Sequence, residues 1–244
     1  MNSSQIVYHA FMISVATLRT CYPEKFGIPR QSGLAPAAWG VVEFTPAYRR
    51  VEAVRGLEDF SHLWLITQFH LINEAETAGA LTVRPPRAGG NERRGVFATR
   101  SPFRPNRLGL TVVRLERVEM EGETAPRLWV SGVDLADGTP IFDIKPYVPY
   151  ADAVGNAQST FANQPPPTVP VRWEVDADVE EKDRAVIVQS IALQPQPAYQ
   201  DNPERTYATE LAGWHVRWRS TEKEAVILVC QPVSKSSVRA GSSS

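Results

Sequence analysis

One short segment carries an acid, an amine and a phenol at alternate positions. Asp143, Lys145 and Tyr147 follow the turn-forming sequence LADGTP at 135–140. Because side chains at every second position of a strand point to one face, a strand over 141–148 places these side chains together: Ile141, Asp143, Lys145 and Tyr147. Such a face can line a polar cleft and move protons on a substrate. The alternative is a surface ion pair between Asp143 and Lys145, worth about 0–1 kcal/mol.

Two proline- and glycine-rich loops carry further polar side chains. The first, KFGIPRQSGLAP at 25–36, presents Arg30 and Gln31 on a stretch that proline stiffens and that glycine opens to close backbone approach. The second, GVFATRSPFRPNRLGLT at 95–111, offers guanidinium, amide and backbone N–H donors together. Taken singly, each is also compatible with an ordinary connecting loop.

Arginines are concentrated in one region of the chain. Nine of them lie between Arg84 and Arg117 against only two acids there, a local net charge of +7. They are Arg84, Arg87, Arg93, Arg94, Arg100, Arg104, Arg107, Arg114 and Arg117. The formal net charge of the whole chain is only −1, since residues 174–183 carry six acids and one lysine. Guanidinium favours bidentate recognition of phosphate or carboxylate, so this region is a candidate anion-binding surface; the alternative is a solvated basic face.

Several classes of function find no support in the chain. It has no G-x-G-x-x-G, Walker or G-x-S-x-G motif, which disfavours a Rossmann site, a P-loop and a nucleophile-elbow hydrolase. Cys21 and Cys230 lie far apart, and the four histidines lack zinc-site spacing, so we expect no metal and a reducing, cytoplasmic setting. We also expect no signal peptide and no membrane span, because no run of about 18 apolar residues occurs.

The spacing of apolar runs predicts a mainly β protein. Short Val-, Ile- and Leu-rich segments alternate with Pro, Gly and Asn clusters, as in a barrel or a sandwich. The expected strands are Val7–Leu18, Gly40–Phe44, Leu63–His70, Gly95–Arg100, Leu108–Met120, Leu128–Leu135 and Ile141–Val148. With 244 residues the chain is long enough for one domain and an appendage. We expect a first domain over 1–152 and a polar, proline-rich linker over 153–170.

The sequence after the linker predicts a helix as well as strands, unlike the mainly β first domain. A strand at 171–175, a helix over Val179–Leu193 and two strands at 214–219 and 224–231 predict a small α+β domain over 171–233. Trp214, Val216 and Trp218 alternate with polar residues and are expected in its core. The tail, 234–244, is expected to be disordered.

Taken together, the segments resemble one known family. PEKFGIPRQSGL, VRGLEDFSHLWLI, TVRPPRAGGNERRGVFATRSPFRPNRLGL, DLADGTPIFDIKPYVPY and the later QPQPAYQ and VRWR are similar, in order, to the TsaA-like (TrmO) family over about residues 6–231. Its members are tRNA N6-methyltransferases acting on threonylcarbamoyladenosine at position 37 of the anticodon loop, usually in threonine tRNA. The resemblance implies a β-barrel-like catalytic domain, a homodimer, and S-adenosyl-L-methionine bound without a Rossmann fold.

The resemblance also implies site residues. The cofactor contacts it implies are Pro29, Arg30, Gln31, His70, Leu71, Arg100, Leu110, Asp134, Leu135, Ala136 and Asp137. For the substrate we expect Phe103, Arg104, Asn106 and Arg107, with Phe26, Phe103 and Tyr147 as aromatics on which a base can stack. Where the family commonly has Asn-Pro, this chain has Asn106-Arg107; Ala16 and Thr20 replace a glycine and a serine of the first strand.

The chemistry of this reaction requires a proton acceptor. The N6 lone pair of the substrate is delocalised into a urea-like group, so its proton must leave as the methyl group arrives. Asp143 and Tyr147 are the candidate bases, and Lys145, Arg30 or Arg104 can hold the threonyl carboxylate. Two alternatives stay open: an RNA-binding barrel without catalysis, and a methyltransferase for a small molecule.

Overall fold

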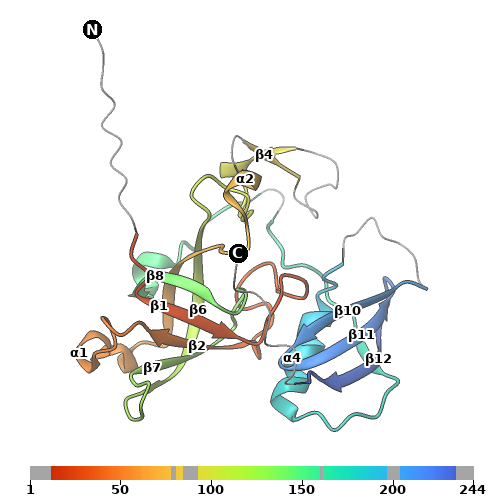
Figure 1. The fold of residues 1–244 in the computed structure, drawn as a ribbon. Coiled ribbons are helices and arrows are strands. Elements are labelled where there is room, and N and C mark those ends of the chain that lie inside the picture. Colours follow the sequence, from red (N-terminus) through yellow and green to blue (C-terminus); the bar gives the residue numbers. More distant parts are fainter. Residues whose placement is uncertain (1–11, 78–80, 85–92, 160–161, 197–203, 235–244) are drawn as a thin grey trace.

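Six strands form a closed antiparallel barrel in the computed structural model (Figure 1), which describes residues 12–77, 81–84, 93–159, 162–196 and 204–234. The barrel strands are β1 (Ala16–Thr20), β2 (Trp39–Phe44), β3 (His62–Gln68), β6 (Leu108–Glu119), β7 (Arg127–Ser131) and β8 (Thr139–Pro146). Their order is β1-β2-β7-β6-β3-β8, and β8 pairs back onto β1. The prediction of a mainly β, barrel-like first domain is confirmed.

The barrel strands alternate between side chains that point into the core and side chains that point outward. In β3 the side chains of Leu63, Leu65 and Thr67 are fully buried, whereas their neighbours are partly exposed. Leu18, Val42, Leu128 and Ile141 fill the same interior from the other strands. Each such apolar side chain contributes about 1.5–3 kcal/mol when removed from water.

The prediction that Ile141 and Asp143 share a face is wrong. Ile141 pairs with Thr67 and is buried, whereas Asp143 pairs with Ile66 and is exposed. The register between β3 and β8 shifts at this point, which marks a β-bulge. A bulge inserts one extra residue and so reverses the side-chain alternation that follows it. Asp143 and Lys145 therefore lie on the outer wall of the barrel.

Short elements connect the barrel strands. They are α1 (Val51–Val54), η1 (Leu57–Asp59), α2 (Glu74–Thr77), β4 (Thr82–Val83), β5 (Arg94–Gly95), η2 (Val96–Ala98) and α3 (Pro149–Asp152). The expected strand over Gly95–Arg100 is wrong, because a 3-10 turn replaces it after Gly95. There the backbone N–H and the hydroxyl of Thr99 both donate to the Val96 carbonyl, so the local turn satisfies groups that a strand would have paired.

Several expected strand ends move by a few residues. The first strand ends at Thr20 rather than Leu18, and the Val7–Phe11 part of that prediction lies outside the described residues. The strand predicted over Leu128–Leu135 ends at Ser131, because Gly132 adopts a φ of +72°. The backbone turns there and leads to Asp134.

The second domain is a four-stranded sheet with one helix. The strands β9 (Val171–Trp173), β10 (Thr206–Leu211), β11 (Trp214–Ser220) and β12 (Ala225–Pro232) are arranged β10-β11-β12-β9, next to α4 (Glu181–Ala192). The prediction of a small α+β second domain is confirmed, although β10 was not expected from the sequence. Val216 and Trp218 are fully buried, as expected of the core. Among the described residues α4 is the longest helix, and no helix there has the length and hydropathy to span a bilayer.

Candidate functional site

The loop at 25–36 lies against the end of β7. The Gly33 backbone N–H donates to the Gly132 carbonyl at 2.9 Å. Gly33 and Gly132 adopt φ values of +75° and +72°, a backbone conformation that glycine accepts without strain, and this conformation shapes the contact. The contact brings Pro29–Gln31 to the residues that follow β7, more than 100 positions later in the chain.

Four polar side chains meet at this end of the barrel; we call Gln31, Arg100, Thr111 and Asp134 the rim cluster. Arg100 donates from Nη1 to Oε1 of Gln31 at 2.6 Å, and the Thr111 hydroxyl donates to Oδ1 of Asp134 at 2.6 Å. Three of the four were expected from the resemblance. Thr111 was missed, because it lies in an apolar strand where nothing in the sequence marks its partner.

Asp134 is the electrostatic centre of the rim cluster. Burial raises the pKa of its carboxyl above the ordinary value, while the Thr111 hydroxyl, nearby backbone N–H groups and the Arg100 charge each lower that pKa. The hydrogen bonds and the Arg100 charge thus offset only part of the free energy that removing this carboxylate from water costs. A cation beside it would remove part of that cost.

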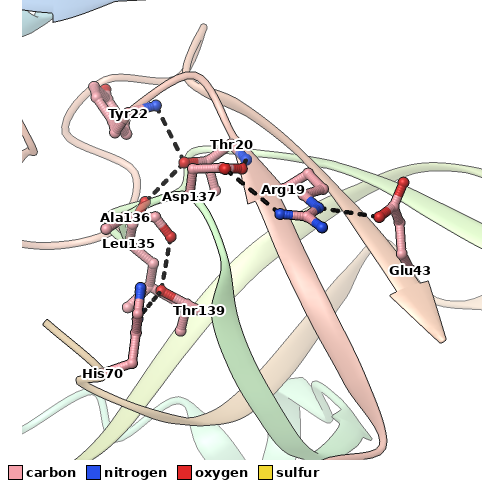
Figure 2. A network of polar contacts seen from close by, with 9 residues as sticks. All are labelled: Arg19, Thr20, Tyr22, Glu43, His70, Leu135, Ala136, Asp137 and Thr139. Atoms are coloured by element: carbon pink, nitrogen blue, oxygen red, sulfur yellow. Dashed lines mark hydrogen bonds and ion pairs between the residues drawn. The ribbon is translucent and has the colours of Figure 1, made fainter. Parts of the chain in front are cut away.

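The turn after Asp134 is held by backbone and side-chain bonds (Figure 2). Oδ1 of Asp137 accepts the Thr20 backbone N–H at 2.9 Å, and Oδ2 lies 3.6 Å from Nη1 of Arg19, which also contacts Glu43. The Leu135 carbonyl accepts the Thr20 hydroxyl at 3.1 Å. The Asp137 carboxylate therefore anchors the turn to β1, and the turn presents residues 134–136 in a fixed shape.

His70 approaches the same turn from β3. Its Nδ1 lies 3.5 Å from the Thr139 hydroxyl, whose proton points to the Ala136 carbonyl at 2.7 Å (Figure 2). The imidazole ring therefore packs along this turn, with Nε2 3.8 Å from the position that a Cβ on Gly138 would occupy. Burial lowers the pKa of His70, against the opposing effect of the Asp137 carboxylate, which favours the neutral ring at pH 7.

Apolar side chains beside the rim cluster are exposed. Leu71 and Leu110 show 39% and 61% of their surface to solvent, unlike the buried leucines of the barrel. The Leu71 carbonyl accepts a hydrogen bond from Nζ of Lys25 at 2.9 Å, which ties this segment to the loop at 25–36. Both leucines were expected at the cofactor site.

The expected substrate loop packs beside His70. The Arg107 carbonyl accepts the Phe69 backbone N–H at 2.8 Å, and the Arg107 guanidinium donates to the Ile72 carbonyl at 2.8 Å. Arg104 donates to the Thr99 carbonyl within the loop at 3.4 Å. Phe103 and Asn106 are exposed. Arg107 thus serves the loop's own structure, while Phe103 and Asn106 face outward.

Arg107 adopts a φ of +49°, which the proline common in the family at this position excludes. We expect Arg107→Pro to lower the melting temperature by several degrees, because it forces the loop to change path. Arg107→Gly loses the bond to Ile72 but accepts the positive φ, so it should melt close to the wild type. Differential scanning fluorimetry compares the two. Equal melting temperatures for both variants would contradict this explanation of the loop.

The outer wall of the barrel holds the remaining expected residues. Asp143, Ile66 and Leu110 form one cross-strand row, and Lys145 lies opposite Trp64 in the next. Neighbours in such a row are about 4.5–5.5 Å apart, so Asp143 lies about 10 Å from Leu110.

Tyr147 lies beyond the far end of β8. Its ring centroid is 5.9 Å from that of Trp64 and 6.3 Å from that of His62. The Trp64 indole N–H donates to Oδ2 of Asp152 at 3.0 Å, which fixes this aromatic group. The structure therefore does not bring Tyr147 to the rim cluster.

The expectation that Phe26 stacks on a base is wrong. Its ring stacks on Trp218 of the second domain, with centroids 5.8 Å apart and planes 16° apart. The position is internal because the loop at 25–36 lies between the two domains.

The arginine-rich region is only partly free to meet a polyanion. Arg114 and Arg117 are exposed on β6, where Arg114 pairs with Glu116 at 3.5 Å and Arg117 lies 4.4 Å above the Trp129 ring. Arg84 and Arg93 are also exposed. Arg87 lies outside the described residues.

Two cavities flank the segment between the domains. One, of about 220 Å³, is bordered by residues 25–30 together with Ser190 and Leu193 of the second domain. The other, of about 280 Å³, is bordered by Thr20, Asp137 and the β10–β11 turn. Neither is bordered by Gln31, Arg100 or Asp134. Within the described ranges, no three His, Cys, Asp or Glu side chains gather as a metal site would require.

The closed barrel and the appended α+β domain define a two-domain protein built on a β-barrel rather than on a Rossmann fold. Residues 17–153 match the tRNA-methyltransferase O N-terminal domain, and residues 166–233 match the TrmO C-terminal domain. The chain belongs to the TrmO family.

Named relatives cover most of the chain. An Escherichia coli tRNA (adenine(37)-N6)-methyltransferase is 39% identical over 230 residues, which are 89% of this chain and 96% of the relative. A Pseudomonas aeruginosa protein, provisionally named S-adenosylmethionine-dependent methyltransferase RcsF, is 47% identical over 84% of this chain and 90% of its own length. A crystal structure of TrmO from P. aeruginosa has a TM-score of 0.73 and 38% identity, covering 91% of this chain and 96% of that one.

Proposed function

We propose that this protein is a tRNA methyltransferase that uses S-adenosyl-L-methionine to methylate N6 of adenosine 37 in the anticodon loop. The substrate form we propose is threonylcarbamoyladenosine, in threonine tRNA. The observation that carries the proposal is the rim cluster, where the partly buried Asp134 carboxylate lies within the electrostatic influence of the Arg100 guanidinium. Membership of the TrmO family supports the same reaction.

The residues at the rim fit the chemical groups of S-adenosylmethionine. Asp134 can face its cationic groups, and Arg100 or Arg30 can face its carboxylate. Leu71 and Leu110 are exposed and can offer apolar cover for the adenine. The cofactor supplies an electrophilic methyl group when bound. The chain's own residues have to orient it and receive the proton that N6 loses.

Asp143 is the proposed proton acceptor. It is exposed on the outer wall, in the same cross-strand row as Leu110 at the cofactor site. One of its oxygens accepts the Ile144 backbone N–H at 2.9 Å, which holds the carboxylate in place. Lys145 lies two residues further on, where its ammonium can pair with the threonyl carboxylate. Because Tyr147 packs with Trp64, we assign it to base stacking rather than to proton transfer.

The tRNA would extend over the basic and aromatic surface beside this site. Phe103 and Asn106 project from the loop next to His70, and Arg114 and Arg117 are exposed on β6. Phosphate contacts by such arginines give affinity without reading sequence. The proposed substrate implies a cytoplasmic enzyme.

We also propose a homodimer. Phe97 is 79% exposed and is not used by the proposed cofactor site, so it is an apolar side chain that a second copy would cover. The proposed division of labour places methyl transfer in residues 1–152, followed by the linker 153–170 and the second domain 171–233.

The reaction is tested with methyl-labelled S-adenosylmethionine and two tRNA preparations, one bearing and one lacking the threonylcarbamoyl group. We expect label in the modified tRNA alone, at N6 of adenosine 37. Binding of tRNA without any transfer would instead support an RNA-binding barrel. Label in small metabolites would support a small-molecule methyltransferase. Equal labelling of both tRNAs would refute the substrate form that we propose.

A further inference from the structure

The segment 20–39 is shared by the proposed cofactor site and the second domain. On the barrel side, the Tyr22 carbonyl accepts the Asp137 backbone N–H at 2.7 Å, and Gln31 and Gly33 make the rim contacts described above. On its other side the same segment meets α4, β10 and β11 (Figure 1). The segment 20–39 therefore lies between the two domains and contacts both of them.

Two consecutive side chains of α4 bind this segment. Oε1 of Gln189 accepts the Ala37 backbone N–H at 2.7 Å, and the Ser190 hydroxyl lies 3.0 Å from the buried Tyr22 hydroxyl. These are side-chain contacts from the second domain to both ends of the loop that carries Pro29–Gln31. A partly buried backbone N–H needs such a partner, so Gln189 stabilises the observed path of the loop.

The second-domain sheet binds the middle of the segment. Oε1 of Glu24 accepts the Thr209 hydroxyl at 2.6 Å and the Glu210 backbone N–H at 2.9 Å. Two residues on, Phe26 stacks on Trp218, and a Cβ on Gly27 would come within 3.0 Å of Leu211. The second domain thus contacts the chain at Glu24, Phe26 and Gly27, two to five residues before the proposed cofactor residues begin at Pro29.

We propose that the second domain sets the affinity for S-adenosylmethionine by holding Pro29–Gln31 in their binding position, with Gln189 as a positioning residue. The inference rests on the function proposed for the rim cluster. Ordering a loop on binding costs conformational entropy and so weakens affinity. When the loop is already ordered in the free protein, the ligand does not incur this cost. Gln189 acts through the Ala37 backbone, because its side-chain contact is with the loop and not with the rim cluster.

The test compares Gln189→Ala with Gln189→Glu. The alanine variant lacks the acceptor for the Ala37 N–H, whereas a glutamate oxygen can still accept it. We expect Gln189→Ala to raise both the Kd and the KM for S-adenosylmethionine about three- to tenfold. This factor corresponds to the loss of one neutral hydrogen bond. At saturating cofactor the kcat and the KM for tRNA should stay at wild-type values, and Gln189→Glu should recover most of the affinity.

A control on the same helix separates positioning from loss of stability. The Arg184 guanidinium lies 4.0 Å above the Trp173 ring, a contact within the second domain. Arg184→Ala should therefore bind the cofactor like the wild type. If Gln189→Ala does not fold, Tyr22→Phe tests the neighbouring contact, with the same rise in Kd expected.

The outcomes distinguish this inference from the proposed function. A wild-type protein that binds no S-adenosylmethionine would refute the proposed function and the inference with it. Wild-type binding together with unchanged affinity in Gln189→Ala, or in Tyr22→Phe where that variant replaces it, would overturn the inference alone. An equal loss in Arg184→Ala, or no recovery in Gln189→Glu, would also overturn it, since the effect would then be general destabilisation.

Discussion

Asp134→Asn should weaken S-adenosylmethionine binding by about 10- to 100-fold, the value of a hydrogen bond or contact to a charged group. The amide oxygen of asparagine can still accept the Thr111 hydroxyl that Asp134 accepts at 2.6 Å, so the local structure should persist. The substitution removes the negative charge that we propose faces the cationic groups of the cofactor. Isothermal titration calorimetry measures the change in Kd.

The same substitution should change how the stability of the protein depends on pH. Because burial raises the pKa of Asp134, folding is disfavoured at pH values where the carboxyl is ionised in the unfolded chain. This penalty is present at neutral pH and disappears as the pH falls below the unfolded pKa, about 3.9. Asparagine removes this charge penalty at every pH, so the pH dependence of thermal unfolding that Asp134 contributes between about pH 4 and pH 7 should disappear.

A matched change elsewhere on the barrel serves as the control. Glu116 on β6 accepts the Ser131 hydroxyl and pairs with Arg114, outside the rim cluster. Glu116→Gln removes the same charge and should bind the cofactor like the wild type. Weaker binding in both variants would show that net charge, rather than Asp134 itself, governs affinity.

Asp143→Ala should lower kcat by about 10²- to 10⁴-fold, the usual contribution of a general base, while the Kd for S-adenosylmethionine stays unchanged. The carboxylate is exposed on the outer wall, so its removal leaves the barrel core intact. Single-turnover assays with threonylcarbamoyl-tRNA, run beside cofactor titrations, separate the two effects. Wild-type turnover in Asp143→Ala would exclude it as the base.

Lys145→Ala tests the neighbouring assignment. It should raise the KM for threonylcarbamoyl-tRNA, and Lys145→Arg should restore it because the arginine keeps the charge that pairs with a carboxylate. Lys223→Ala, on the exposed turn between β11 and β12 of the second domain, is the control for loss of one positive surface charge. A KM that is unchanged in Lys145→Ala would remove Lys145 from substrate binding.

The sequence by itself was sufficient for the fold class and the family. The spacing of turn residues between apolar runs predicted a mainly β chain, and the PRQ, SPFRPNR and DLADGTP segments carried the resemblance to the TrmO family. Both signals are local: they depend on residues within about a dozen positions of one another. For the same reason α4 and the β11–β12 hairpin were predicted nearly to the residue.

Other features depend on contacts that only the tertiary structure creates. The bulge between β3 and β8 reverses the face on which Asp143 lies, and a strict period of two cannot show it. Thr111 belongs to the rim cluster because it bonds Asp134, which lies 23 residues away in the chain. Phe26 packs between the domains because it stacks on Trp218 of the second domain. A side chain's partner across a barrel or a domain interface depends on register and packing, so sequence spacing alone does not determine it.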